Sequence, residues 1–316
     1  MVARTYIQPL AVVGRRASDI APVGRLCECP PSKKGYGMTR LGPTTDNDRP
    51  FFGVELKLAR ARMHAQAFGA SVAEWQSNPL SAHGEISEDR RTYKLVLDDF
   101  AVVPPVELWG MLIGDCVHNL RSALDNLCFS AARLRCDPPA DPRGIQFPIF
   151  DTRQAYKSNA ARTLKQLPDS AVALLEHFQP FQKNAADEIQ RHSLMMLQHL
   201  SNQDKHRIPQ VALLRVHQSD HRQELTFESN VAAEEWIAAA PNFVIEGGPV
   251  WAGSTLVSVT CSRPAGRIQG TVTVEAFPVI DTPIGLQGAC PAIDTLALQV
   301  GTIFEAFRRT FPNARD

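Results

Sequence analysis

Residues 114–127 read GDCVHNLRSALDNL and combine an apolar stripe with a dense set of polar side chains. Pro104 and Pro105 favour a helix start just before this stretch, and Asp137-Pro138-Pro139 stops the helix after it. The stretch therefore predicts one long helix over about residues 106–134. Its apolar positions recur every three or four residues, the period of one helix face: Ile113, Val117, Leu120, Leu124, Leu127, Ala131 and Leu134.

The polar side chains of this helix gather on the face roughly opposite the apolar stripe. Asp115, His118, Ser122 and Asp125 lie three or four residues apart, and Arg121 and Asp125 have the spacing of an ion pair. Three interpretations stay open: a solvated face with one weak ion pair, a buried structural network, or a functional site. In a functional site, His118 would transfer protons or bind a metal, and Asp125 would orient it.

A second polar set, LSNQDKHR at residues 200–207, ends another helix predicted over about residues 187–207. Lys205, His206 and Arg207 in a last helical turn can simply face the exposed carbonyls there. Asn202 and His206 are four residues apart, and His199 falls on nearly the same face. We expect the two polar sets to turn inward and meet in a polar cleft between these two helices.

The candidate site residues come from both polar sets. The candidate catalytic residues are His118, Arg121 and His206. The candidate ligand-binding residues are Asp115, Asn119, Asp125, Asn202, Asp204 and Arg207. We expect no metal and no cofactor, but His118, His199 and His206 with a carboxylate form an alternative metal site of the kind found in helical bundles. The chain has no GxGxxG, P-loop, HExxH or GxSxG motif, which counts against the chemistries that these motifs support.

The rest of the pattern predicts an α+β fold: a helical bundle of four or five helices with an inserted antiparallel β region. IQFPIF at 145–150 is an extended apolar clip, because Pro148 is unsuited to a helix interior. Short runs rich in β-branched residues at 92–105 and after 210 predict strands, and their short links favour antiparallel pairing. Further helices are expected at about 51–78, 153–166, 168–178 and 291–311, with a short helical insert around Trp236.

These elements divide the chain into four segments. Residues 1–50 lack a sustained apolar period and lean positive, so a disordered tail, translated upstream sequence before a start at Met38, and a targeting peptide all stay open. Residues 51–209 form the helical bundle and residues 210–286 the antiparallel β region. Residues 287–316 form a C-terminal helix that packs back on the bundle.

Composition indicates an ordinary globular protein. The 316 residues carry no net charge, so there is no strong nucleic-acid signal, and no apolar run approaches the ~20 residues that cross a bilayer. Seven scattered cysteines without a CxxC pair indicate reduced thiols and a cytoplasmic location. Cys290 precedes a predicted helix start, which can lower a thiol pKa. The partner is unknown, and a homodimer is compatible with the sequence.

The segments IGDCVHNLRSALDNL, FPIF and LSNQDKHR, in this order, resemble an uncharacterised family of bacterial cytoplasmic proteins. The likeness covers about residues 51–210, with a looser likeness through the C-terminal helix. It implies the architecture and no particular activity. The leading hypothesis is therefore a bacterial cytoplasmic protein, not assigned as an enzyme, whose polar cleft binds a ligand or a partner.

A more distant likeness is to HEPN-type helical bundles, many of which are RNA-cleaving toxins or nucleotide-binding helpers. Their catalytic mark is an Arg followed by a His after four to six residues near a helix start. Arg191 and His199 are too far apart for this mark, and Arg215 and His221 fall in a predicted strand-to-loop region. The likeness implies a metal-independent ribonuclease only if His118 or His206 meets Arg121 or Arg207 across helices. A metal-dependent hydrolase using His118, His199 and His206 is the third hypothesis.

Overall fold

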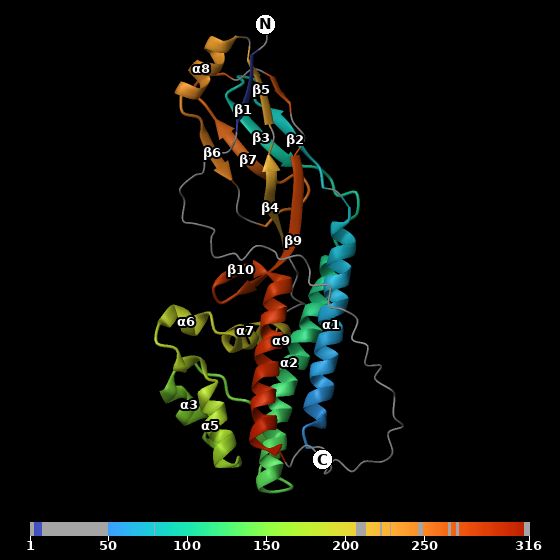
Figure 1. The fold of residues 1–316 in the computed structure, drawn as a ribbon, viewed down its shortest axis with the longest axis vertical. Helices are drawn as coiled ribbons and strands as arrows, with labels where there is room; N and C mark the ends of the chain where they lie inside the picture. The colour runs from blue at the N-terminus through green and yellow to red at the C-terminus, as the bar shows by residue number, and fades with distance from the viewer. Residues whose placement is uncertain are drawn as a thin grey trace.

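The computed structural model describes residues 3–7, 50–78, 80–206, 213–221, 223–227, 229–245, 249–264, 267–269 and 272–312. For residues 3–7, 204–206, 213–221, 223–227, 245, 267–269 and 272–274 it describes the backbone alone. The described chain is α+β and elongated, with a helical half and a β half at opposite ends of the long axis (Figure 1). Apart from strand β1 and Pro50, the predicted segment 1–50 lies outside the described residues.

Three long helices form the centre of the helical half: α1 (Phe52–Gln76), α2 (Val106–Arg135) and α9 (Ala289–Thr310). They lie side by side, and each contacts the other two (Figure 1). The helices expected at 51–78, 106–134 and 291–311 are confirmed. Most of the apolar stripe of α2 is buried, as is the apolar face of α9 from Leu296 to Phe307. The apolar residues that recur at helical spacing are thus the ones that these helices bury.

Shorter helices cover one side of this centre, and two predicted helices are broken. The short helices are α3 (Arg153–Asn159), α4 (Ala161–Leu164), α5 (Asp169–His177), α6 (Ala186–Gln190) and α7 (Ser193–His206), with 3₁₀ turns at Pro142–Gly144 and Pro180–Gln182. The expected helix 153–166 divides at Ala160. The expected helix 187–207 divides before α7, because His192 Nδ1 accepts a hydrogen bond from Leu194 N at 3.2 Å and caps the new helix start.

The β half is antiparallel throughout the described pairs, as predicted. One sheet has the order β2 (Ala82–Ile86), β3 (Thr92–Leu97), β7 (Thr255–Thr260), β6 (Asn242–Ile245). A second has the order β10 (Gly285–Gly288), β9 (Val272–Thr282), β4 (Leu213–His221), and a third the order β1 (Ala3–Ile7), β5 (Gln223–Phe227), β8 (Arg267–Gln269). Helix α8 (Asn230–Ala238) is the short insert expected around Trp236.

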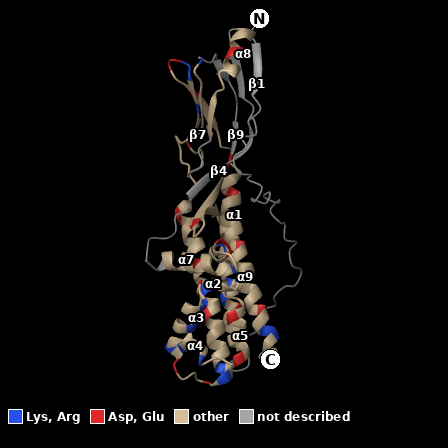
Figure 2. Ribbon diagram, turned by 90° about the vertical axis from the view of Figure 1, so that its left-hand side faces the viewer, with Lys and Arg blue, Asp and Glu red and all other residues tan. Residues whose placement is uncertain are grey.

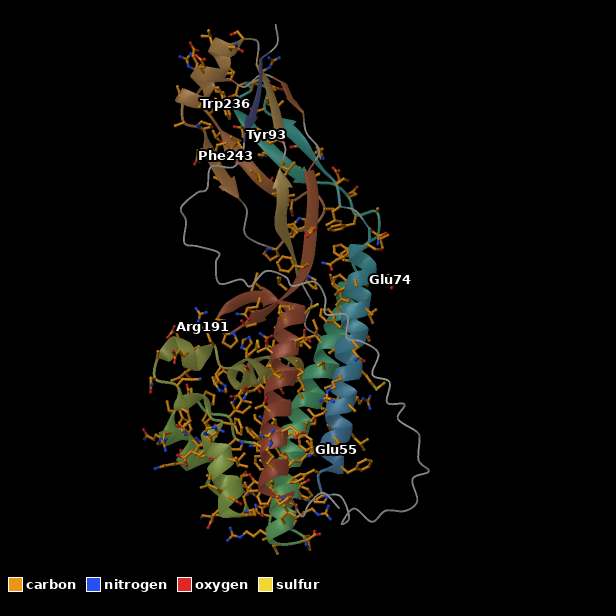
Figure 3. The ribbon with its side chains drawn as sticks, in the orientation of Figure 1. Glu55, Glu74, Tyr93, Arg191, Trp236 and Phe243 are labelled. Carbon is orange, nitrogen blue, oxygen red and sulfur yellow. The ribbon has the colours of Figure 1, made fainter. Side chains whose placement is uncertain are left out.

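Two stretches of the chain build the β half. Strands β4 to β10 lie between α7 and α9 in the chain, where the inserted β region is expected, but β2 and β3 come from between α1 and α2. Tyr93, Trp236 and Phe243 mark this half in Figure 3. The sequence does not reveal β2, because its residues AHGEI are mostly exposed and do not alternate. Gly84 lies against the Tyr93 ring, where an added Cβ would come within 2.7 Å of Tyr93 Cε2.

The two halves share one continuous apolar core. Trp75 packs edge-on against Trp109 with ring centroids 5.6 Å apart, and its indole donates to Val102 O at 2.8 Å. Trp109 donates to Ser71 Oγ at 2.9 Å, and Gln76 Nε2 donates to Ala276 O at 2.8 Å, which ties α1 to β9.

Positively charged Lys and Arg residues are interspersed with negatively charged Asp and Glu residues over the helical half (Figure 2). No helix within the described ranges combines the length and apolarity needed to cross a bilayer.

Replacing Trp109 by Ala tests this shared core. Trp109 is fully buried, so the Trp109→Ala variant is expected to lose about 3–5 kcal/mol of unfolding free energy in a denaturant titration. Trp251→Ala is the matched control, because Trp251 is 67% exposed and its loss should change stability by no more than about 0.5 kcal/mol. Equal effects of the two variants would contradict the assignment of Trp109 to the core.

Candidate functional site

The extended segment Ile145–Phe150, here called the clip, crosses the side of α2 without a strand partner among the described residues. Its main chain is held by side chains instead. Arg121 Nη2 donates to Phe147 O at 2.8 Å, and Phe147 N donates to Asp125 Oδ1 at 2.9 Å. Arg121 and Asp125 are themselves paired at 3.1 Å. The ion pair expected on the helix face therefore holds both main-chain groups of Phe147.

Two further side chains complete this support. Gln179 is only 1% exposed, accepts from Phe150 N at 3.1 Å and donates to Pro148 O at 2.8 Å. Thr163 Oγ1 donates to Gly144 O at 2.9 Å. The Phe150 ring packs edge-on against Tyr156, whose burial raises the pKa of its hydroxyl. Phe147 N and O, Pro148 O and Phe150 N of the clip are thus paired with side chains and not with a β ladder.

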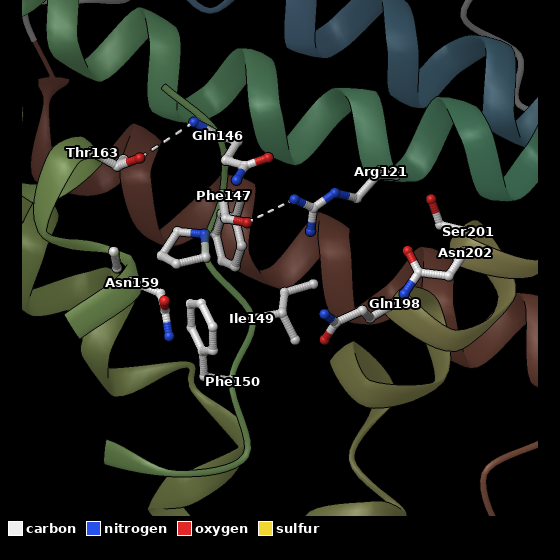
Figure 4. Close-up of a pocket in the computed structure, with 12 residues that line it drawn as sticks. Arg121, Gln146, Phe147, Ile149, Phe150, Asn159, Thr163, Gln198, Ser201 and Asn202 are labelled. Carbon is white, nitrogen blue, oxygen red and sulfur yellow. Dashed lines mark hydrogen bonds between the residues drawn. The ribbon is translucent and has the colours of Figure 1, made fainter. Parts of the chain in front are cut away.

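A pocket of about 170 Å³ opens between the clip, α2, α3, α4 and α7 (Figure 4). Arg121 enters it from α2, and Gln198, Ser201 and Asn202 enter it from α7. The two polar sets therefore supply side chains to the same pocket. The lining residues that the structure describes are Arg121, Gln146, Phe147, Pro148, Ile149, Phe150, Asn159, Ala160, Thr163, Gln198, Ser201 and Asn202.

The chemistry of this lining suits binding more than bond breaking. It combines one guanidinium, several amides and hydroxyls, and an apolar wall formed by the clip. No histidine, cysteine or carboxylate is among the described residues of the lining. The nucleophile and general base that acyl transfer needs are therefore not paired among the described residues of this pocket.

Other candidates from the first polar set lie outside the pocket. Asp115 is exposed and faces α1, with its Oδ2 atom 3.7 Å from His64 Nδ1. His118 is also exposed, with Nε2 3.5 Å from Ser122 Oγ on its own helix. Asp125 does not orient His118, because its carboxylate is bonded to Phe147 N and Arg121. Among the described side chains, His118 therefore contacts Ser122, while Asp125 contacts the clip and Arg121.

The remaining candidate residues lie on α2 and at the end of α7. Asn119 is 3% exposed, donates to Asp115 O at 2.7 Å and does not line the pocket. Its Oδ1 atom has no hydrogen-bond partner within the described part of the chain. Asn202 lines the pocket. Asp204 and His206 are described by their α7 backbone alone, and Arg207 lies outside the described residues.

Two further interpretations concern a metal site at His118, His199 and His206 and the thiol of Cys290. His199 Nε2 lies 2.8 Å from Gln203 Nε2 and 3.9 Å from Asp281 Oδ2. Among the residues that the structure describes, no group of three or more His, Cys, Asp or Glu side chains is placed to hold a metal. Cys290 lies at the start of α9, but burial raises its pKa to about 11, so the helix start does not lower it.

Sequence reasoning missed several residues of the pocket and the clip support. Gln198 and Asn202 are four residues apart, so the helix period alone identifies Gln198 as a neighbour of a candidate residue. Ser201 lies within the quoted segment but was not selected. Gln179 and Thr163 have no local signal, because their partners are 31 and 19 residues away in the chain.

No protein-family model, curated protein or solved structure matches this chain. The candidate site therefore rests on the geometry of the chain itself. Among the candidates named from sequence, that geometry brings Arg121 and Asn202 into one pocket and assigns Asp125 to the support of its wall.

Replacing Gln179 by Leu tests the support of the clip. The variant leaves Phe150 N–H and Pro148 C=O without their partner, so we expect a loss of about 2–4 kcal/mol in unfolding free energy. Gln182→Leu is the matched control, because Gln182 is exposed and makes one bond, to Glu176 O. A Gln179→Leu protein as stable as this control in urea titration would refute the role of Gln179.

Proposed function

We propose that this chain binds a small polar ligand in the pocket between α2, α7 and the clip. The observation that carries the proposal is the convergence of Arg121 with Gln198, Ser201 and Asn202, because these side chains belong to distant parts of the chain. A cavity of about 170 Å³ is smaller than the ~300–1,000 Å³ typical of pockets for drug-sized ligands. The proposed ligand is correspondingly small.

The pocket has the composition of a recognition site. Its clip wall is apolar, and seven of the twelve described lining residues are polar and come from separate elements of the fold, so the pocket suits a polar ligand. Arg121 is already oriented by Phe147 O and Asp125, so little side-chain entropy would be lost when a ligand binds. These features favour ligand binding over a purely structural role for the whole polar set.

The proposal also covers the family, the cellular location and the division of the chain into segments. We infer a bacterial cytoplasmic protein of the family that the sequence resembles, with segments at 1–50, 51–209, 210–286 and 287–316. Helices α1, α2, α7 and α9, with α5 against α9, fit the expected bundle of four or five helices. In this proposal, the bundle serves as a rigid frame for the pocket and the protein is not assigned as an enzyme.

The ribonuclease alternative has less support from the described residues. It requires a histidine to meet an arginine across helices, whereas His118 contacts its own helix and Arg121 is directed to the clip. The alternative therefore depends on His206 and Arg207, whose side chains lie outside the described residues. Ligand binding at the described pocket is the function that we favour.

Pocket variants test ligand binding directly. A thermal-shift screen with amino acids, short carboxylic acids, amides, sugars and nucleosides should find a compound that raises the Tm of the full chain. Gln198→Leu and Asn202→Leu remove polar groups from the lining and should reduce that shift. Gln190→Leu is the control, because Gln190 is exposed on α6 and outside the lining. A compound that stabilises all three variants equally would place its site elsewhere.

An RNA cleavage assay separates the alternative. We expect the full chain to leave a fluorescently labelled RNA intact in EDTA, because the described pocket contains no histidine that could act as a base. Gel electrophoresis of the labelled RNA provides the readout. Cleavage that disappears in His118→Ala or His206→Ala, with unfolding unchanged, would favour the ribonuclease.

A further inference from the structure

We propose that the pocket ligand is a small organic carboxylate, bound by the Arg121 guanidinium. This inference rests on the proposed function, since it names the ligand class of the same pocket. Among the side chains that the structure describes, Arg121 is the one charged group in the lining, and none of the lining side chains is acidic. The charge of the lining thus favours an anion over a cation.

The guanidinium has donors left for a ligand. Its Nη2 atom is bonded to Phe147 O and paired with Asp125 Oδ1. Within the described residues, its Nε and Nη1 atoms make no hydrogen bond, although the side chain is only 15% exposed. Figure 4 shows the guanidinium between the clip and the amides of Gln198 and Asn202. The guanidinium that lines the pocket therefore has N–H groups available for a ligand.

The charge of the guanidinium favours a carboxylate. Hydrogen bonds from a guanidinium to an ionised carboxylate are stronger than bonds to a neutral acceptor. Asp125 holds the guanidinium on its other side and is not part of the lining, so it fixes the orientation without occupying the pocket. Gln198 and Asn202 each offer both a donor and an acceptor, so they would bind the rest of the ligand irrespective of its charge.

The other lining residues determine the size and polarity of the part of the ligand beyond the carboxylate. Phe147, Ile149 and Phe150 form an apolar wall beside Arg121. A cavity of about 170 Å³ leaves room for a short chain or a single ring next to the carboxylate. Short aliphatic or benzoic-type acids therefore match the pocket better than extended or highly charged anions.

Matched acids and amides test the charge of the ligand. Propionate against propionamide, and benzoate against benzamide, differ in charge but hardly in size. In calorimetric titration of the full chain, each acid should bind at least about tenfold more tightly than its amide. Gln198→Leu should weaken the acid and its amide by similar factors, since Gln198 binds without regard to charge.

Two variants at the ion pair extend this test. Arg121→Gln should weaken acid binding about tenfold or more and leave amide binding nearly unchanged. Since Arg121 also holds Phe147 O, that variant could fail to fold, so Asp125→Asn provides a second test. An asparagine can still accept from Phe147 N but no longer neutralises Arg121, so acid affinity should rise about threefold or more while amide affinity stays constant.

The outcomes separate this inference from the proposed function. Amides that bind as tightly as their acids, or an Asp125→Asn variant without a gain in acid affinity, would overturn the carboxylate. If neither acids nor amides bind, but a sugar or nucleoside binds in a Gln198-dependent manner, the carboxylate is wrong and the pocket stands. If none of these compounds binds, both proposals are wrong.

Discussion

The pairing of Arg121 and Asp125 with the main chain of Phe147 is the interaction on which the site depends. An extended segment that packs on helices has no ladder to satisfy its amides and carbonyls, and burial of such groups without partners is costly. One turn of α2 pairs the main chain of Phe147, because Asp125 accepts from its N–H and Arg121, four residues earlier, donates to its C=O. The clip is thereby fixed as the wall of the pocket.

The first polar set combines all three interpretations that its sequence allows. Asp115 and His118 form an exposed face, Asp125 belongs to a structural network, and Arg121 serves that network and the pocket together. An i, i+4 ion pair on a helix surface contributes little to stability by itself. The importance of this pair comes from its place beside the clip, which brings a cation and an extended backbone into contact.

The sequence predicts those parts of the fold that depend on neighbouring residues, such as the apolar period of a helix or the effect of a proline. The stripe of α2 and the apolar face of α9 follow from period, and the clip follows from Pro148. The break before α7 was missed because it depends on a cap by His192, and β2 was missed because few of its side chains are buried. Gln179 could not be found, because a lone glutamine acquires its role only from a distant segment.

The double use of Arg121 links the pocket to the stability of the clip. The same guanidinium that bonds Phe147 O also lines the pocket, so an anion bound there would hold the side chain in the orientation that the clip requires. A ligand that binds only the folded arrangement stabilises it by mass action. Occupation of the pocket and order in the clip would therefore reinforce each other. If the pocket binds an anion as proposed, one residue forms both a binding contact and a structural support, and an arginine, with five N–H donors, has enough donors for both roles.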